Sequence, residues 1–270
     1  MSREILKLMC VLAHPDDESL GLGGVLAKYA AEGVETYLVT ATRGERGWPR
    51  GEEAYPGLVA LGEIREAELC AAAEVLGLQE VNLLDYIDGE LDRANPEEVI
   101  GKIASHLRRV RPHVVITFDP MGIYGHPDHI AICQFTTAAM IAAADSTYDL
   151  DPGLLPHRVL KLYYMVDTSA DLIAYQAAFG DLVMEIDGVQ REAISWEEWA
   201  ITARIDARAY GSRVWEAISC HRSQLPFYET LSRLPEEEWA NLWGFQKFYR
   251  AFSLVNGGRQ MERDLFEGIK

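Results

Sequence analysis

The first 119 residues alternate between two hydrophobic periods, and this alternation constrains the fold more than any other feature. Short apolar runs of strand length are separated by segments in which apolar residues recur at helical spacing. The runs lie at residues 5–13, 34–42, 80–85 and 113–119. Because strands that alternate with helices pair in parallel, we predict an α/β fold: a Rossmann-like, mostly parallel sheet with helices on both faces. Ligands of such sheets bind beyond the carboxyl ends of the strands.

The second half of the chain has a weaker pattern. Strand-like runs are predicted at residues 158–166, 182–187 and 248–255, and one long helix at residues 196–219. Five of the six tryptophans lie here, which predicts helices packed on a sheet or, alternatively, an aromatic wall beside a substrate. Because no repeat or Ser/Gly-rich linker divides the chain, residues 1–270 are predicted to form a single domain whose second half completes the pocket.

The composition excludes several classes of partner and location. The chain has 42 acidic and 25 basic residues, a formal charge of −17, and no basic stripe, so nucleic acid is not an expected partner. The four cysteines are far apart and show no C-x-x-C spacing, which predicts buried thiols in a reducing cytoplasm. No signal peptide and no apolar segment of spanning length is recognisable, so membrane insertion is not expected.

Polar side chains follow each of the four predicted strands of the first half. Because the carboxyl ends of parallel strands meet in one crevice, these residues are expected to form one site. In chain order, they are His14, Asp16 and Asp17; Arg43 and Glu45; Asp85 and Asp88; and Asp119.

Two H-P-D motifs supply metal-ligating residue types at this crevice. They lie in AHPDDE at residues 13–18 and in YGHPDH at residues 124–129, where Pro127 predicts a helix start capped by His126. His14, Asp17 and His129 offer two nitrogens and one carboxylate, a set that suits zinc with one open position. Fe²⁺ or another divalent metal suits the same set. Asp16 should point away from Asp17 and stay free as a general base.

These motifs carry a resemblance to a known family. AHPDDE, R-x-x-E at residues 65–68, YGHPDH and HRSQ at residues 221–224 resemble the zinc-dependent PIG-L/LmbE-like N-deacetylases, over about residues 6–268. Members of that family remove acyl groups from N-acetylglucosamine units. The resemblance implies a metal-dependent amide hydrolase acting on a small N-acylated sugar conjugate.

The resemblance also implies roles for individual residues near the metal. It makes His14, Asp17 and His129 the zinc ligands and Asp16 the general base. It further implies that His126 stabilises the oxyanion or protonates the leaving amine.

Other roles implied by the resemblance concern support and substrate binding. Asp128 would favour protonated His126, although a first-turn acid at a helix N-terminus is an equal alternative. Tyr124 would swing toward the intermediate. The expected substrate-binding residues are Arg65, Asp88 and His221. For Arg65 the alternative is an exposed pair with Glu68, and for Asp88 it is an Asp-Gly turn.

Several functional alternatives stay open. An amidase of a thiol S-conjugate of the mycothiol or bacillithiol type and a metal-dependent phosphoesterase could use a similar ligand set. A receiver-type domain would also place Asp residues after a first strand, and a non-enzymatic binding protein could retain the fold. The long segment at residues 43–57 could act as a lid. Assembly into a homo-oligomer is compatible with the aromatic second half.

Overall fold

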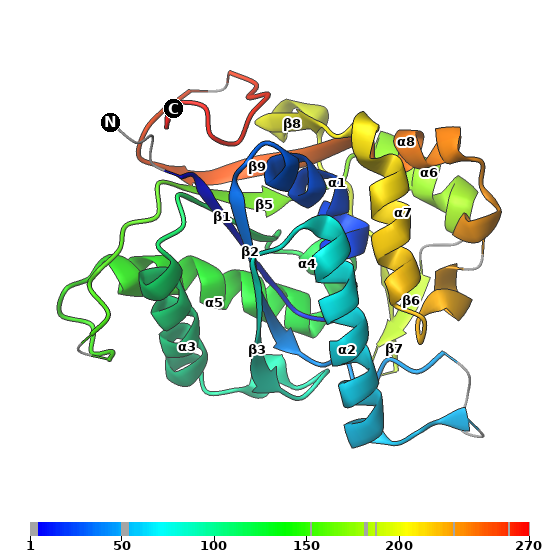
Figure 1. Cartoon of the computed structure of the whole chain (residues 1–270), viewed down its shortest axis with the longest axis horizontal. Helices are drawn as coiled ribbons and strands as arrows, with labels where there is room; N and C mark the ends of the chain where they lie inside the picture. The colour runs from blue at the N-terminus through cyan, green and yellow to red at the C-terminus, as the bar shows by residue number, and fades with distance from the viewer. Residues whose placement is uncertain are drawn as a thin grey trace.

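The computed structural model describes residues 5–49, 54–151, 153–180, 183–186, 188–228, 230–258 and 260–269. Its main feature is a seven-stranded sheet of order β3-β2-β1-β4-β5-β9-β8 (Figure 1). Five strands pair in parallel, and β9 runs antiparallel to both of its neighbours. The strands are β1 (Lys7–Leu12), β2 (Glu35–Thr42), β3 (Glu80–Tyr86), β4 (Val114–Phe118), β5 (Lys161–Met165), β8 (Ala203–Asp206) and β9 (Phe245–Ser253). The predicted α/β fold with a mostly parallel sheet is confirmed.

Helices cover both sides of the strands, as Figure 1 shows. The helices α3 (Pro96–Val110) and α5 (Pro127–Ala144) pack against each other, whereas α1 (Asp17–Ala31) and α2 (Leu58–Leu76) pack against α7 (Gly211–Cys220). All of β4 and all but the first residue of β1 are buried, as expected for central strands covered on both faces. The other helices are α4 (Gly122–Gly125), α6 (Ser169–Phe179) and α8 (Glu236–Trp243). No helix among the described residues is both long and apolar enough to cross a bilayer.

The long helix predicted at residues 196–219 is wrong. This segment holds the 3₁₀ turn η3 (Glu198–Ala200), strand β8, the 3₁₀ turn η4 (Arg208–Tyr210) and only then α7. In β8, Ala203 and Ile205 are buried while Arg204 and Asp206 are exposed, which is the period of a strand. Pairing with β9 fixes this segment as a strand. The sequence did not indicate a strand here, because an alternation of only four residues is hard to recognise within an apparent helical pattern.

Three further elements lie between the larger ones or beside the site. They are η2 (Leu91–Arg93), η5 (Leu225–Tyr228) and η6 (Leu231–Arg233). A separate two-stranded hairpin consists of β6 (Val183–Ile186) and β7 (Val189–Glu192). The expectation of four buried thiols is only half right, because Cys70 is exposed and Cys220 is partly exposed, although all four cysteines are free.

A buried ion pair ties the C-terminal segment to the sheet. The Lys161 ammonium on β5 lies 2.6 Å from Oε1 of Glu262, and both side chains are almost fully buried. Tyr163 donates a hydrogen bond to Oε2 of Glu262 at 2.5 Å, and Nη1 of Arg250 lies 2.9 Å from Oε1. Burial alone would raise the pKa of Glu262, but these partners outweigh burial and lower it.

Glu262→Gln is expected to lower the free energy of unfolding by about 3–5 kcal/mol, because the Lys161 ammonium would stay buried without its carboxylate. Chemical denaturation measures this loss. Glu198→Gln removes an exposed partner of Arg204 and is the matched control, with an expected change below about 1 kcal/mol. Equal effects of the two variants would contradict a stabilising role for the buried pair.

Candidate metal and catalytic site

The turn after β1 brings three acidic or imidazole side chains to the carboxyl end of the sheet. Asp16 has a φ of 99°, a left-handed conformation that is uncommon for a residue other than glycine. Asp17 begins α1, and its Oδ2 accepts hydrogen bonds from the backbone amides of Ala13 at 3.2 Å and His14 at 2.7 Å. The turn therefore fixes the direction of the Asp17 carboxylate.

The side chains of His14, Asp17 and His129 lie close together, and the two histidines face different oxygens of Asp17. Nδ1 of His14 lies 3.2 Å from Nε2 of His129 and 3.8 Å from Oδ2 of Asp17. Nε2 of His129 lies 3.6 Å from Oδ1 of Asp17, and the His129 ring stacks on Phe118 with centroids 3.8 Å apart. Ligands about 2.0–2.2 Å from a tetrahedral metal lie about 3.3 Å from one another. The donor atoms therefore fit a small divalent cation.

His126 offers a third imidazole at the same place. Nitrogens of His14, His126 and His129 lie within 4.8 Å of one another and could also hold a metal ion. His126 caps α5 as the sequence predicts, because its Nδ1 accepts a hydrogen bond from the backbone amide of Asp128 at 3.1 Å. Burial and the charge of His14 lower the pKa of His126 to about 4.

Two carboxylates hold the far side of the His14 ring. Nε2 of His14 lies 3.1 Å from Oδ1 of Asp88 and 3.2 Å from Oδ2 of Asp128. Burial opposes a charged imidazole, but these carboxylates outweigh burial and raise the pKa of His14 well above its ordinary value. A metal on Nδ1 would compete with the second ring proton that this raised pKa favours. With that proton displaced, the remaining one stays on Nε2 between the two acceptors, as in many metal-ligating histidines.

This arrangement bears on two expected roles. Asp128 is fully buried, and the backbone amides of Gly89 and Leu91 donate to its carboxylate at 2.7 and 3.1 Å. Its carboxylate therefore supports His14, and its contact with His126 runs through its backbone amide. Asp88 lies in the Asp-Gly turn that was its alternative, since the amide of Glu90 donates to the backbone oxygen of Ile87 at 3.0 Å and Gly89 has a φ of 78°. It is 8% exposed, accepts a hydrogen bond from the backbone amide of Arg46 and faces His14, and sugar binding by Asp88 stays a prediction.

Asp16 is held by two donors from distant parts of the chain. Nη2 of Arg65 lies 3.0 Å from Oδ2 of Asp16, and the Tyr228 hydroxyl donates to the same oxygen at 2.9 Å. Arg65 is 4% exposed and also donates to the backbone oxygens of Gly44 and Pro15. The expected exposed pair of Arg65 with Glu68 is therefore wrong, because Arg65 is buried and pairs with Asp16. Substrate binding by Arg65 stays a prediction.

Tyr228 is a site residue that sequence reasoning missed. It lies on η5, four residues beyond the HRSQ motif, and no spacing rule connects it with Asp16. Burial and the nearby Asp16 carboxylate raise the pKa of Tyr228 well above its ordinary value, so the hydroxyl keeps its proton and acts as a donor.

His221 does not line the pocket that was expected for it. Its side chain is fully buried, and Nε2 lies 2.8 Å from Oε1 of Glu18. Oε2 of Glu18 accepts a hydrogen bond from the backbone amide of Asp16 at 3.0 Å. Burial works against both charges, but their mutual attraction raises the pKa of His221 and lowers that of Glu18. The pair therefore supports the metal turn, by which we mean the turn after β1 that carries Asp16 and Asp17.

The segment at residues 43–57 is described only in part, because residues 50–53 lie outside the described residues. The described part is tied down: Nε2 of Gln224 donates to the backbone oxygen of Gly47 at 2.8 Å. The Tyr55 hydroxyl donates to the backbone oxygen of Glu45 at 3.2 Å. A lid function for this segment stays a prediction.

A strained turn carries Tyr124 into the site. Ile123 has φ 63° and ψ −64°, an outlier for a β-branched residue. Its amide donates to Oδ1 of buried Asp119 at 2.8 Å, and Nε1 of Trp196 donates to Oδ2 at 2.7 Å. The Tyr124 ring then lies 5.2 Å from that of His129, centroid to centroid. Strained conformations persist where the surrounding structure over-determines them.

Trp196→Phe is expected to lower the free energy of unfolding by about 1.5–3 kcal/mol, because it removes a hydrogen bond to the buried carboxylate of Asp119. Thermal or chemical unfolding measures the loss. Trp199→Phe is the matched control, since Trp199 is 71% exposed. An effect no larger than that of the control would exclude this hydrogen bond as the restraint on the turn.

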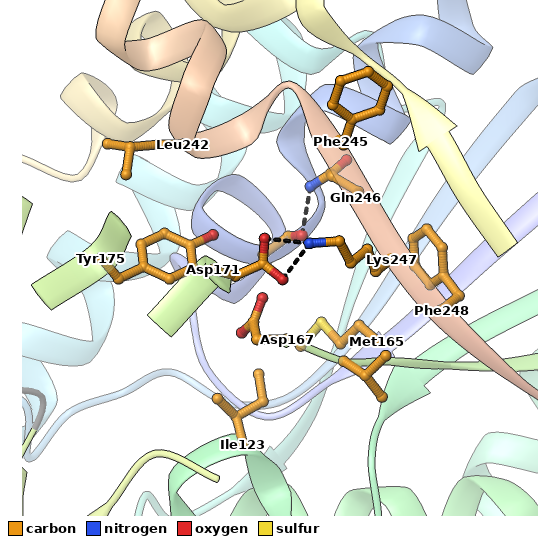
Figure 2. Close-up of a pocket in the computed structure, with 12 residues that line it drawn as sticks. Ile123, Met165, Asp167, Asp171, Tyr175, Leu242, Phe245, Gln246, Lys247 and Phe248 are labelled. Carbon is orange, nitrogen blue, oxygen red and sulfur yellow. Dashed lines mark hydrogen bonds and ion pairs between the residues drawn. The ribbon is translucent and has the colours of Figure 1, made fainter. Parts of the chain in front are cut away.

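A small cavity lies beside the same turn, between Ile123, Met165 and Lys247 (Figure 2). Its volume is about 40 Å³, enough for water but too small for a sugar. The Lys247 ammonium pairs with Asp171 at its wall. Burial and Asp171 raise the pKa of the neighbouring Asp167 to about 7. The cavity is therefore not the substrate pocket.

Comparisons with known proteins show the family of this chain. A family model described as GlcNAc-PI de-N-acetylase (PIG-L) matches residues 9–140. A protein of Rhodococcus jostii is 36% identical over 244 residues, which cover 81% of this chain and 82% of the relative. That relative is named 1D-myo-inositol 2-acetamido-2-deoxy-alpha-D-glucopyranoside deacetylase.

Two solved structures share the fold. N,N'-diacetylchitobiose deacetylase from Pyrococcus horikoshii has a TM-score of 0.66 and 24% identity, over 90% of this chain and 83% of that chain. The 4-carboxy-2-hydroxymuconate hydratase from Pseudomonas putida has a TM-score of 0.67 and 20% identity, over 94% of this chain and 99% of that chain. At these identities the likeness shows the fold alone, and function must be argued from the site.

Proposed function

Because the chain belongs to the PIG-L (GlcNAc-PI de-N-acetylase) family, we propose that it hydrolyses the acetamide of a small N-acetylglucosamine-type conjugate with the help of a divalent metal. The observation that carries the proposal is the convergence of His14, Asp17 and His129 beside Asp16. The free thiols fit a cytoplasmic location, which we include in the proposal.

His14, Asp17 and His129 would hold the metal, for which zinc is our first choice and Fe²⁺ the alternative. When bound, the metal acidifies the attacking water and polarises the acyl carbonyl. Burial raises the pKa of Asp17 to about 7. The positive charge of the metal would offset this effect and favour the ionised carboxylate.

Asp16 is the proposed general base. Arg65 and Tyr228 both donate to its Oδ2, so we assign proton transfer to Oδ1. The two donors also fix the rotamer, which keeps the base in place. After taking the proton from the attacking water, Asp16 can return it to the departing amine.

His126 and Tyr124 are the proposed donors to the developing oxyanion. Nδ1 of His126 accepts from the Asp128 amide, so the neutral ring carries its proton on Nε2 and can donate it in a hydrogen bond. The lowered pKa of His126 favours this neutral form over the protonated form that was expected. Each such donor contributes roughly 10²-fold or more to the rate in related sites.

Product analysis tests the proposed reaction. The purified, zinc-loaded protein is incubated with an N-acetylglucosaminyl inositol, diacetylchitobiose, a thiol S-conjugate of an acylated cysteinyl sugar and a sugar phosphate. We expect stoichiometric acetate and free amine from the first or second compound. Cleavage of the S-conjugate alone would identify an amidase, and release of phosphate alone would identify a phosphoesterase. No reaction with any of the four would refute the proposal.

A further inference from the structure

Arg191 is a cation beside the candidate site with unused hydrogen-bonding capacity. It lies on β7, and its Nη1 is 3.5 Å from the point that a Cβ on Gly125 would occupy. Gly125 directly precedes His126, so the guanidinium lies against the turn that carries the catalytic imidazole. Nε of Arg191 is buried and has no hydrogen-bond partner among the described residues. Buried donors are normally satisfied, so this one requires an explanation.

The hairpin that carries Arg191 is fixed to the site. The strand β7 packs against α4, and the amide of Ile194, just beyond β7, donates to the backbone oxygen of Ile123 at 2.8 Å. Figure 1 shows β6 and β7 beyond the carboxyl ends of the central strands. Arg191 is therefore held at the rim of the site by a backbone contact to the same strained turn that places Tyr124.

The other arginines around the metal turn already have carboxylate partners. Within the described residues, their charges are neutralised by neighbours on α2, on β3, in the loop between β3 and η2, or on the turn itself. The pairs are Arg43 with Glu66 and Asp85, Arg46 with Glu90, and Arg65 with Asp16. Arg191 forms no ion pair with any residue in the described parts of the chain, so its charge remains available for a ligand.

The candidate site near Arg191 is rich in negative charge, which bears on the charge of the substrate it can accept. The site contains the carboxylates of Asp16, Asp17, Asp88 and Asp128, and the whole chain has a formal charge of −17. A negatively charged substrate would be repelled unless a local positive charge received it. The planar guanidinium matches the oxygens of a carboxylate or a phosphate and can donate two parallel hydrogen bonds to either.

We propose that Arg191 binds an anionic group, a phosphate or a carboxylate, on the non-reacting part of the substrate. The inference rests on the proposed deacetylase function and deepens it, because it selects anionic N-acetylglucosamine conjugates over neutral ones. The unpartnered Nε and one terminal nitrogen of the guanidinium form the side that meets the anion.

The test compares acetate release from neutral and anionic probes. The probes are N-acetylglucosamine, its 1-phosphate and 6-phosphate, and N-acetylmuramic acid, which carries a carboxylate. For the wild type we expect kcat/KM at least about tenfold higher for one or more anionic probes than for N-acetylglucosamine. Preference for the phosphates or for the carboxylate identifies the source of the charge. Arg191→Gln should bring the ratio of kcat/KM between the anionic and the neutral probes close to one, while Arg191→Lys should retain part of the preference.

Arg208→Gln is the matched control, because it removes the same charge from an exposed pair with Asp206. It should keep the wild-type preference. An equal preference in wild type and Arg191→Gln, or none in the wild type, would overturn the inference. Calorimetric titration with glucosamine 6-phosphate and glucosamine measures the same discrimination without turnover. If none of these probes releases acetate, the titration still decides whether Arg191 binds the anion, and the four compounds named under the proposed function decide whether the reaction itself occurs.

Discussion

Asp16→Asn is expected to lower kcat for acetate release by about 10²–10⁴-fold while the bound metal stays at the wild-type stoichiometry. Asparagine keeps the size of the side chain and tolerates the left-handed φ of this position, so the turn should persist. It cannot accept the proton of the attacking water. Steady-state kinetics and metal analysis of the same preparation measure the two quantities together.

Asp92→Asn is the control for Asp16→Asn, since Asp92 is an exposed carboxylate on η2. It should leave both kcat and metal content unchanged. Turnover of Asp16→Asn at the wild-type rate would require another base. Loss of metal from Asp16→Asn would instead indicate that Asp16 is a ligand. The assignment of Asp16 as the base and Asp17 as the ligand would then be wrong.

His129→Ala is expected to lose the metal and, with it, acetate release. The substitution removes one of three proposed ligands, so metal affinity should fall by more than the 10- to 100-fold that is typical of residues that only support a ligand. Equilibrium dialysis against zinc, followed by elemental analysis, measures the affinity. His129 is buried against Phe118, so circular dichroism and thermal unfolding must show that the variant is folded.

Two further histidine variants make the His129 result specific. His106→Ala removes an imidazole on α3 that lies outside the site and should leave metal affinity unchanged. His126→Ala should retain the metal and lose rate, because we assign His126 to the oxyanion. A folded His129→Ala variant that binds metal normally would contradict both candidate ligand sets, because His129 belongs to each. A His126→Ala variant that loses the metal would favour the set of three histidines over the set that includes Asp17.

The first half of the fold could be predicted because its pattern and its packing agree. Buried parallel strands such as β1 and β4 need continuous apolar runs, and such runs are visible in the sequence. The segment at residues 196–219 could not be predicted correctly, because the strand character of β8 depends on pairing with β9, about 40 residues further along. Propensity yields to tertiary pairing in such short strands.

The metal-binding residues could be proposed from sequence for a topological reason. His14 follows β1 and His129 begins the helix after β4, and β1 and β4 are neighbours in the sheet. Family membership, which the motifs also suggested, is confirmed by the comparisons. Individual roles were harder to predict, because a polar residue at a strand end can face a substrate or support a ligand. Only packing distinguishes these cases.

Arg65 and His221 illustrate that difficulty. Both belong to motifs typical of the family, and both are buried with their polar atoms directed at Asp16 or Glu18. Tyr228 carries no motif and reaches Asp16 across 212 residues of sequence. Such a contact depends on where η5 packs in the fold, so it cannot be predicted from the residues near Tyr228 in the sequence. The contacts that hold Asp16 were therefore not predicted from the sequence, and the role of Asp16 as the base stays a proposal.

The central claim is that the chain binds one divalent metal through His14, Asp17 and His129. Anomalous diffraction from zinc-soaked crystals tests it most directly. We expect one strong peak about 2.0–2.2 Å from Nδ1 of His14, Nε2 of His129 and an oxygen of Asp17. A peak on the other side of the His14 ring, between Asp88 and Asp128, or a peak that excludes Asp17, would contradict the account.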